Sequence, residues 1–312
     1  MQIHYDLNSF EKLNFAVVTS GTFDGVHLGH QKILGKLKEI ATQKKGETVL
    51  ITYFPHPRMV LFNDSQNLKL LNTITEKIDL LAQFGLDHLV IIPFTREFSE
   101  INSKTYIQSI LVNQIGAKVL VIGYDHRFGK NREGSFNYLS ENAQQFGFEV
   151  IEIPRHDIEN IGISSTQIRN SLLAGDVKQA SNLLGSQYSL TGKVVKGKQL
   201  GRTLGYPTAN IYVVENYKLI PADGVYAVQI IYNSKQYNGV LNIGKRPTIE
   251  GKDRTIEVNI FDFDKEIYGE NLTIHFIEKI RDEKKFESLE NLKIQIKKDA
   301  ELAKSILNEI DQ

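Results

Sequence analysis

Short apolar runs alternate with amphipathic segments through the first half of the chain. The runs are rich in β-forming residues and predict five strands, at Phe15–Ser20, Thr48–Phe54, Leu89–Phe94, Val119–Tyr124 and Glu149–Ile153. The segments between them repeat apolar residues about every 3.6 positions and predict four helices, at Gln31–Lys44, Thr75–Phe84, Ser103–Ile115 and Phe136–Phe146. This alternation is typical of an α/β fold, in which helices cover both faces of a parallel sheet and ligands gather at the carboxyl ends of the strands.

The pattern changes near Gly185, after two short predicted helices at Thr166–Ala174 and Val177–Leu184. From residue 188 to residue 280 several short β-forming runs follow one another without helices between them, which is typical of a small antiparallel barrel. The clearest strands are Tyr226–Ile230, Asn238–Ile243, Thr255–Phe261 and Leu272–Ile277, with a hairpin turn at Asn233-Ser234-Lys235. A last helix, Ser288–Ile310, has one apolar stripe expected to pack on the barrel, formed by Leu289, Leu292, Ile296, Ala300, Ala303 and Leu307. We therefore predict two domains, 1–185 and 186–312.

Composition narrows the class of protein. The chain has 312 residues, of which 41% are hydrophobic and 24% charged, as in soluble globular proteins. Lysines plus arginines equal aspartates plus glutamates at 37 each, so no overall field favours nucleic acid or an anionic membrane. The absence of cysteine excludes disulfides, thiolate metal sites and a cysteine nucleophile. With no secretion signal and no apolar run near the ~20 residues of a membrane helix, we expect a cytoplasmic monomer or weak homo-oligomer that acts on small molecules.

A glycine-containing turn at residues 21–30 follows the first strand and opens the first helix. Glycines let the backbone approach a ligand closely, and the first turn of a helix offers unpaired N–H groups to phosphate. His27 and His30 are three residues apart, on one side of that turn. They could instead be a helix cap and a surface residue, but the preceding strand and glycine turn favour a phosphate site with two imidazole donors. Other residues of the turn expected to bind the nucleotide are Gly21, Phe23 and Asp24.

A second phosphate signal lies at the start of the helix near residue 166. Ser164, Ser165 and Thr166 offer hydroxyl and N–H groups, and Arg169 lies four residues after Ser165, on the same face of the helix. Taken alone, this is an N-cap beside a surface arginine. Together with the histidine turn, it predicts that one helix start holds the α-phosphate of a nucleotide and the other holds the β- and γ-phosphates.

Two further loops follow predicted strands of the first domain. Residues 53–58 contain His56 between two stiffening prolines, and residues 123–129 contain Asp125 and Phe128 as a polar anchor and a stacking surface. Each loop could serve only as a turn, and for His56 the functional and the purely structural interpretations stand level.

In the second domain, a glycine-spaced loop precedes a strand. Such a loop can close over phosphates with its N–H groups, and its expected contacts are Gly197, Gly201 and Arg202. Thr208 and Asn210 are two apart and point to the same face of an extended strand. A hydroxyl and an amide oxygen are suitable ligands for Mg²⁺. The alternative is an ordinary junction between loop and strand.

The first half resembles the adenylyltransferase module of bacterial bifunctional riboflavin kinase/FMN adenylyltransferases, often called FAD synthetases. The matching motifs are GTFDGVHLGH, FPHP, GYDHRFG and ISSTQIR, with Thr22 where the family usually has asparagine. The resemblance implies a Rossmann-like nucleotidyltransferase domain in which His27 and His30 contact phosphates. It also implies that the ISSTQIR segment holds the triphosphate, while His56 and Asp125 line the nucleotide and flavin sites. Because FMN is already an anion, its attack on ATP needs positioning and charge stabilisation rather than a general base.

The second half resembles the riboflavin kinase module. Its matching motifs are GKQLGRTLGYPTAN, GVYAV, NIGKRPT, TIEVNIFDF and KFESLENLKIQIKKD. The resemblance implies that Thr208 and Asn210 serve the magnesium–ATP site and that Glu257 is the catalytic base. It also implies that Asn242 and Arg246 of NIGKRPT belong to the binding site. A base is needed here because a primary hydroxyl must lose its proton to attack.

These observations predict an enzyme that phosphorylates riboflavin to FMN and then adenylylates FMN to FAD, with ATP as co-substrate, Mg²⁺ as cofactor and pyrophosphate as product. One rival is another H-x-G-H nucleotidyltransferase, acting on phosphopantetheine or a choline phosphate, which would have no need of the P-T-A-N barrel. The other is a flavin-binding regulator that has lost catalysis. Such a regulator need not keep His27, His30, Thr208, Asn210 and Glu257.

Overall fold

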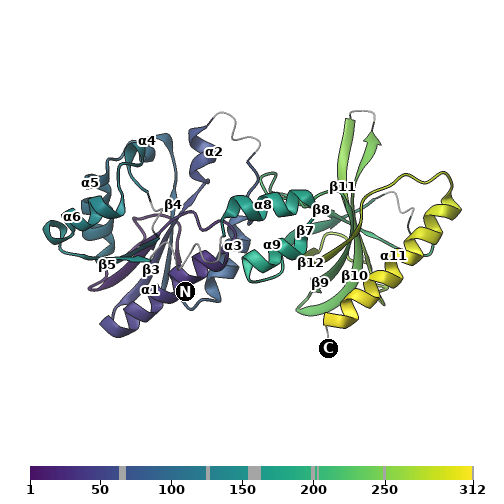
Figure 1. The fold of residues 1–312 in the computed structure, drawn as a ribbon, viewed down its shortest axis with the longest axis horizontal. Helices are drawn as coiled ribbons and strands as arrows, with labels where there is room; N and C mark the ends of the chain where they lie inside the picture. Colours follow the sequence, from purple (N-terminus) through teal and green to yellow (C-terminus); the bar gives the residue numbers. More distant parts are fainter. Residues whose placement is uncertain are drawn as a thin grey trace. The chain divides into compact units, whose positions relative to one another are not determined.

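The computed structural model describes residues 1–62, 68–123, 127–153, 163–197, 201, 204–248 and 251–310, with only the backbone at 132, 246–248 and 251–253 (Figure 1). Packing divides the chain into two compact units, Met1–Ser164 and Ser165–Gln312. The helices between residues 165 and 184 therefore group with the barrel. The predicted boundary at residue 185 concerns the functional modules and stays a prediction.

The first unit is built on a six-stranded parallel sheet, which confirms the predicted fold class. Its strands are β1 (Gln2–His4), β2 (Ala16–Ser20), β3 (Glu47–Phe54), β4 (His88–Pro93), β5 (Ala117–Gly123) and β6 (Glu149–Ile153). They lie in the order β1-β4-β3-β2-β5-β6, so the chain changes direction across the sheet between the neighbours β2 and β5. Parallel sheets bind ligands outside the carboxyl ends of the strands at such a reversal.

Helices cover both faces of this sheet, as the alternation of elements predicts. Neighbouring strand residues point to opposite faces: Val17 packs with Leu37 of α1, whereas Val18 packs with Ile107 on the other side. The first face carries α1 (Leu28–Lys44) and α3 (Ile74–Ala82), and the second carries α5 (Ser103–Thr105), the π-helix η2 (Tyr106–Ile115) and α6 (Phe136–Phe146). The short helices α2 (Pro57–Leu61), α4 (Arg96–Ser99) and η3 (Lys130–Arg132) lie in the connections.

The segment predicted as one helix over Ser103–Ile115 differs from an α-helix after its first turn. At its end the Gly116 N–H bonds to the Leu111 carbonyl, five residues back, which is the π-helical spacing. Apolar periodicity over ten residues indicates a helix but does not separate these two hydrogen-bond patterns. Gly116 has φ +84°, and a side chain there would collide with the backbone of Leu13, so glycine is required at this helix end.

The second unit begins with the helices α8 (Ser165–Ala174) and α9 (Val177–Leu184), which are followed by a closed antiparallel barrel in the strand order β10-β11-β8-β7-β12-β9. The strands are β7 (Ser189–Val195), β8 (Ala209–Tyr212), β9 (Gly224–Tyr232), β10 (Lys235–Thr248), β11 (Gly251–Ile260) and β12 (Asn271–Arg281). Asn233 and Ser234 both have positive φ, so β9 and β10 are joined by the tight turn that the sequence predicts. The predicted barrel is confirmed.

Helix α11 (Leu289–Ile310) lies along the barrel (Figure 1). Its Ala303 and Leu307 pack against Val225 and Ala227 of β9. The predicted apolar stripe is wrong at its start, because Leu289 is 60% exposed and the first turn of the helix leaves its side chains in solvent. No helix within the described ranges is long and apolar enough to cross a membrane.

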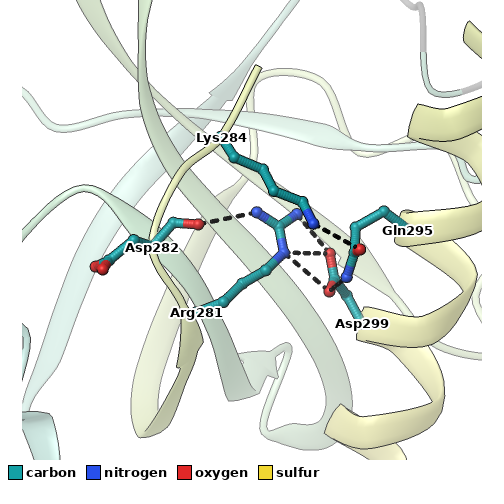
Figure 2. Close-up of polar contacts among 5 residues, drawn as sticks. All are labelled: Arg281, Asp282, Lys284, Gln295 and Asp299. Carbon is teal, nitrogen blue, oxygen red and sulfur yellow. Dashed lines mark hydrogen bonds and ion pairs between the residues drawn. The ribbon is translucent and has the colours of Figure 1, made fainter. Parts of the chain in front are cut away.

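An ion pair anchors α11 at the end of β12 (Figure 2). Nε of Arg281 lies 3.0 and 3.1 Å from the two carboxylate oxygens of Asp299, and its Nη2 lies 2.6 Å from one of them. Gln295 donates to the same carboxylate at 2.7 Å and accepts from Lys284 at 2.9 Å. Asp299 is 5% exposed, and burial of a carboxylate requires such partners.

Candidate functional site

The first candidate site is the loop between β2 and α1, at the reversal point of the parallel sheet. The Gly21 N–H donates to the Ile51 carbonyl at 3.0 Å, which ties the start of the loop to β3. Gly25 has φ +92°, and Val26 has φ +43°, a left-handed conformation that β-branched residues rarely adopt. Strained backbone of this kind concentrates at functional sites.

Buried polar side chains brace the loop from within the fold. The carboxylate of Asp24, 1% exposed, accepts from the Leu71 N–H at 3.0 Å and from the Asn72 N–H at 3.4 Å. The ammonium group of Lys77 donates to the Thr22 carbonyl at 2.7 Å. Asp24 thus has a structural task, and its predicted contact with the nucleotide stays a prediction. Sequence analysis missed Lys77, because no motif distinguishes it from the many exposed lysines of this chain.

His27 and His30 form a stacked pair at the start of α1. Their ring centroids are 3.7 Å apart with an interplanar angle of 15°, and the ring of Phe23 lies 4.7 Å from that of His30. His27 is the N-cap: its Nδ1 accepts from the His30 N–H at 3.4 Å, so the neutral ring carries its proton on Nε2. The capping interpretation of His27 is therefore confirmed, and its predicted contact with a phosphate stays a prediction.

Nδ1 of His30 is buried and has no hydrogen-bond partner among the described residues. Burial, and then the nearby His27 and Lys77, hold the pKa of His30 well below its usual value. The ring is therefore neutral at pH 7. An unsatisfied buried nitrogen is costly in a folded protein, and it marks a place where a ligand can supply the missing partner.

Two other predicted residues follow the carboxyl ends of β3 and β5, the strands on either side of β2. His56, 8% exposed, caps α2 through Nδ1, which accepts from the Arg58 N–H at 3.1 Å. Phe128, 7% exposed, lies 5.4 Å from the ring of Tyr106, whose hydroxyl is 2.9 Å from that of Tyr53. Both tyrosines have raised pKa values because they are buried. Phe128 thus belongs to an aromatic cluster at this edge of the first unit.

The predicted second phosphate site is at the start of α8. Ser165 begins this helix, and Arg169 lies one turn later, both partly exposed. Ser164 and Thr166 are exposed on either side of Ser165. By packing, α8 belongs to the second compact unit, so that its cooperation with the histidine turn in binding one nucleotide stays a prediction.

The second candidate site lies on the outer face of the barrel. Glu257 of β11 is directly opposite Asn210 of β8 on one side and Asn242 of β10 on the other, and opposed residues point to the same face. Ile256 and Val258 are buried in the barrel, so Glu257 projects outward, because neighbouring residues of a strand point to opposite faces. The Thr208 hydroxyl donates to the Glu257 carboxylate at 3.4 Å. The structure therefore gathers these four predicted residues, Thr208, Asn210, Asn242 and Glu257, at one place.

The glycine-spaced loop lies directly against these residues. A Cβ added to Gly197 would lie 2.5 Å from Cγ of Asn210, and one added to Gly201 would lie 3.3 Å from the Thr208 hydroxyl. The Gly201 carbonyl accepts from the Tyr206 N–H at 2.8 Å, which closes the turn. Glycine is needed at both positions because no side chain fits between the loop and the strand.

A cavity of about 280 Å³ opens beside Thr208. It is lined by the Pro207–Ala209 segment, by Val194, Val258 and Ile260 of the barrel, and by residues 263–268, which include Phe263 and Tyr268. Sequence analysis missed this wall, although two aromatic residues in a loop after a strand were a signal for it. Among the other predicted residues, Asp125 and Arg202 lie outside the described residues, as does the side chain of Arg246.

Comparisons with known proteins match both halves of the chain to known families. Residues 9–167 match the FAD synthetase family model and residues 184–307 match the riboflavin kinase family model. Bifunctional riboflavin kinase/FMN adenylyltransferases from Haemophilus influenzae and Bacillus subtilis are 39% and 37% identical, covering 96% and 92% of this chain and 97% and 91% of theirs. A crystal structure described as a macrolide-efflux protein from Streptococcus pneumoniae has a TM-score of 0.88 at 32% identity, covering 97% of this chain and 98% of its own.

The two matched family models, one for FAD synthetase and one for riboflavin kinase, define a bifunctional transferase. The chain belongs to the family of bacterial bifunctional riboflavin kinase/FMN adenylyltransferases. It phosphorylates riboflavin to FMN with ATP and adenylylates FMN to FAD with release of pyrophosphate. The predicted activity is thus confirmed, and the comparisons favour it over the two rival interpretations, transfer to phosphopantetheine or choline phosphate and a purely regulatory role.

Proposed function

We propose that adenylyl transfer takes place at the loop of residues 21–30. The observation that carries this is the buried Nδ1 of His30, which has no hydrogen-bond partner within the described part of the chain. A phosphate oxygen of FMN attacks the α-phosphorus of ATP, and the bond from that phosphorus to the bridging oxygen breaks as pyrophosphate leaves. His27 and His30 stabilise the charge that develops, together with the N–H groups at the start of α1. The ISSTQIR segment, through Ser165 and Arg169, would hold the rest of the triphosphate.

In the barrel, Glu257 would take the proton from the primary hydroxyl of riboflavin as that oxygen attacks the γ-phosphorus of ATP, leaving ADP. Thr208 and Asn210 supply a hydroxyl and an amide oxygen beside this carboxylate, a donor set that suits Mg²⁺. When bound, the ion would neutralise charge on the phosphates. Gly197 and Gly201 would let the loop backbone approach those phosphates.

The cavity beside Thr208 would take the adenine base of the ATP used in this step. Its volume of about 280 Å³ and its partly aromatic wall suit a planar ring. Thr208 lines this cavity and also donates to the Glu257 carboxylate, so it would connect the base to the reacting phosphate. In the other module, the aromatic cluster around Phe128 would flank the isoalloxazine ring of FMN.

Chromatography of the products tests both assignments in the intact chain. With riboflavin and ATP, Glu257→Gln should reduce FMN formation by about 10²- to 10⁴-fold, because the amide cannot accept the proton. The same variant should convert supplied FMN to FAD at close to the normal rate. His30→Ala should show the reverse pattern, with adenylylation lowered by about 10²-fold or more.

Loss of both activities in a folded Glu257→Gln protein would contradict the division of labour between the sites. Full kinase activity in that variant would reduce Glu257 to an ordinary barrel residue. Normal FAD synthesis by His30→Ala would remove the histidine loop from the mechanism.

A further inference from the structure

We infer that Lys77 is a positioning residue for FMN adenylylation, whose buried ammonium group fixes the loop that carries His27 and His30. The inference rests on the proposal that this loop holds the phosphates of ATP. Lys77 lies on α3, opposite the loop, and is only 5% exposed. It matches none of the motifs that point to the active site.

The ammonium group is bonded to the loop itself. Its Nζ donates to the Thr22 carbonyl at 2.7 Å, and the Thr52 hydroxyl donates to the same oxygen at 3.2 Å. Two donors from different elements thereby fix the orientation of the peptide between Thr22 and Phe23. Phe23 follows with φ +46°, a conformation that needs a fixed neighbour, and its ring packs against His30.

Packing alone does not explain a cation at this position. Burial lowers the pKa of Lys77, which means that the fold opposes its charge, and only the Asp24 carboxylate acts in the other direction. The residue also lies in the first turn of α3, next to the capping box of Thr73 and Glu76, where the positive end of the helix dipole disfavours a cation. A methionine would fill the same space without these costs.

The charge of Lys77 also affects the electrostatic environment of His30. It is one of the groups that lower the pKa of His30, after burial and His27. The Asp24 carboxylate accepts from the Leu71 and Asn72 N–H groups and so braces the same loop. Lys77 thus sets the backbone of the loop and helps to keep His30 neutral until a phosphate arrives.

Lys77→Met tests this inference, with Lys38→Met as the matched control on an exposed position of α1. Lys77→Met should lower kcat for FMN adenylylation by about 10- to 100-fold, because a small displacement of positioned groups has effects of that size, while KM for ATP changes less. Riboflavin phosphorylation by the same polypeptide should stay normal.

The pKa of His30, followed by NMR, should rise when the nearby positive charge is removed. Thr52→Val, which deletes the second donor to Thr22, should lower kcat in the same direction but less.

The results separate this inference from the proposal beneath it when His30→Ala is measured alongside. If His30→Ala abolishes adenylylation but Lys77→Met has normal kcat, the role of Lys77 is refuted and the site stands. If His30→Ala is also normal, the site assignment itself fails. The Lys77→Met protein can also lose activity only because it unfolds at a lower temperature. Its activity would then return to normal on cooling, which would show that Lys77 is merely structural and overturn the inference.

Discussion

At the scale of single residues, His30 links the electrostatics of the fold to its chemistry. Its pKa lies well below the usual value of 6.5. As the pH falls below about 6.5, the His30 ring takes up a proton in the unfolded chain but stays unprotonated in the folded protein. The unfolded state then binds more protons, and the contribution of His30 to the free energy of unfolding decreases on acidification. At neutral pH the ring is uncharged until an anionic ligand alters its surroundings.

Binding of a triphosphate should therefore raise the pKa of His30, because negative charge nearby favours the imidazolium form. NMR titration of the histidine resonances, with and without a saturating non-hydrolysable ATP analogue, measures this shift. His30→Gln identifies the resonance and serves as the control. An unchanged His30 pKa in the saturated enzyme would mean that no phosphate lies near the ring.

At the scale of secondary-structure elements, the kinase site depends on the close packing of the glycine-spaced loop against strand β8. Gly197→Ala should lower riboflavin phosphorylation by about 100-fold, because the new methyl group would displace the side chain of Asn210. Gly35→Ala in α1 is the matched control: nothing lies within 4 Å of its added Cβ, and it should leave both activities intact. Steady-state kinetics with riboflavin decide the matter. A fully active Gly197→Ala enzyme would show that this loop can move away from the strand at no cost.

The anchor of α11 is a second prediction at this scale. Asp299→Ala removes the partner of Arg281 and should destabilise the barrel by about 3 kcal/mol, since the guanidinium would remain partly buried and unpaired. Glu301→Ala is the control on the same helix. Its pair with Lys297 is 3.9 Å long and both side chains are more than 60% exposed, so the change should be under about 1 kcal/mol. Urea denaturation gives both values, and equal effects would contradict the anchor.

At the scale of the whole molecule, the boundary between the packing units does not coincide with the end of the FAD synthetase match. Helix α8 packs with the barrel, yet the FAD synthetase family model extends to residue 167. If Arg169 serves adenylylation, Arg169→Lys should weaken the use of ATP in that reaction by about tenfold, since lysine lacks the bidentate fork. Riboflavin phosphorylation should be unaffected. The KM for ATP, measured separately in each reaction, tests this, and an unchanged value with FMN would leave Arg169 as a surface residue.

Much of the architecture was readable from local patterns in the sequence. Alternating runs predicted the parallel sheet and the barrel because side chains repeat every second residue in strands and about every 3.6 in helices. The position of Glu257 between two buried neighbours followed from the same rule. The glycines near His27 and Thr208 were visible because only glycine permits such close approach of backbone. The resemblance to a known family supplied the chemistry.

Other features were decided by tertiary structure alone. Three features arise from segments that meet only after folding. They are the burial of Lys77, the absence of a hydrogen-bond partner for His30 Nδ1 among the described residues, and the lining of the cavity by residues 263–268. Leu289 fits the apolar period of its helix but lies beyond the surface that the barrel offers. Periodicity reports which face of an element is apolar, whereas burial, charge environment and cavities depend on what packs against that face. The sequence by itself therefore determined the elements and the motifs, and the tertiary structure decided which of their side chains meet.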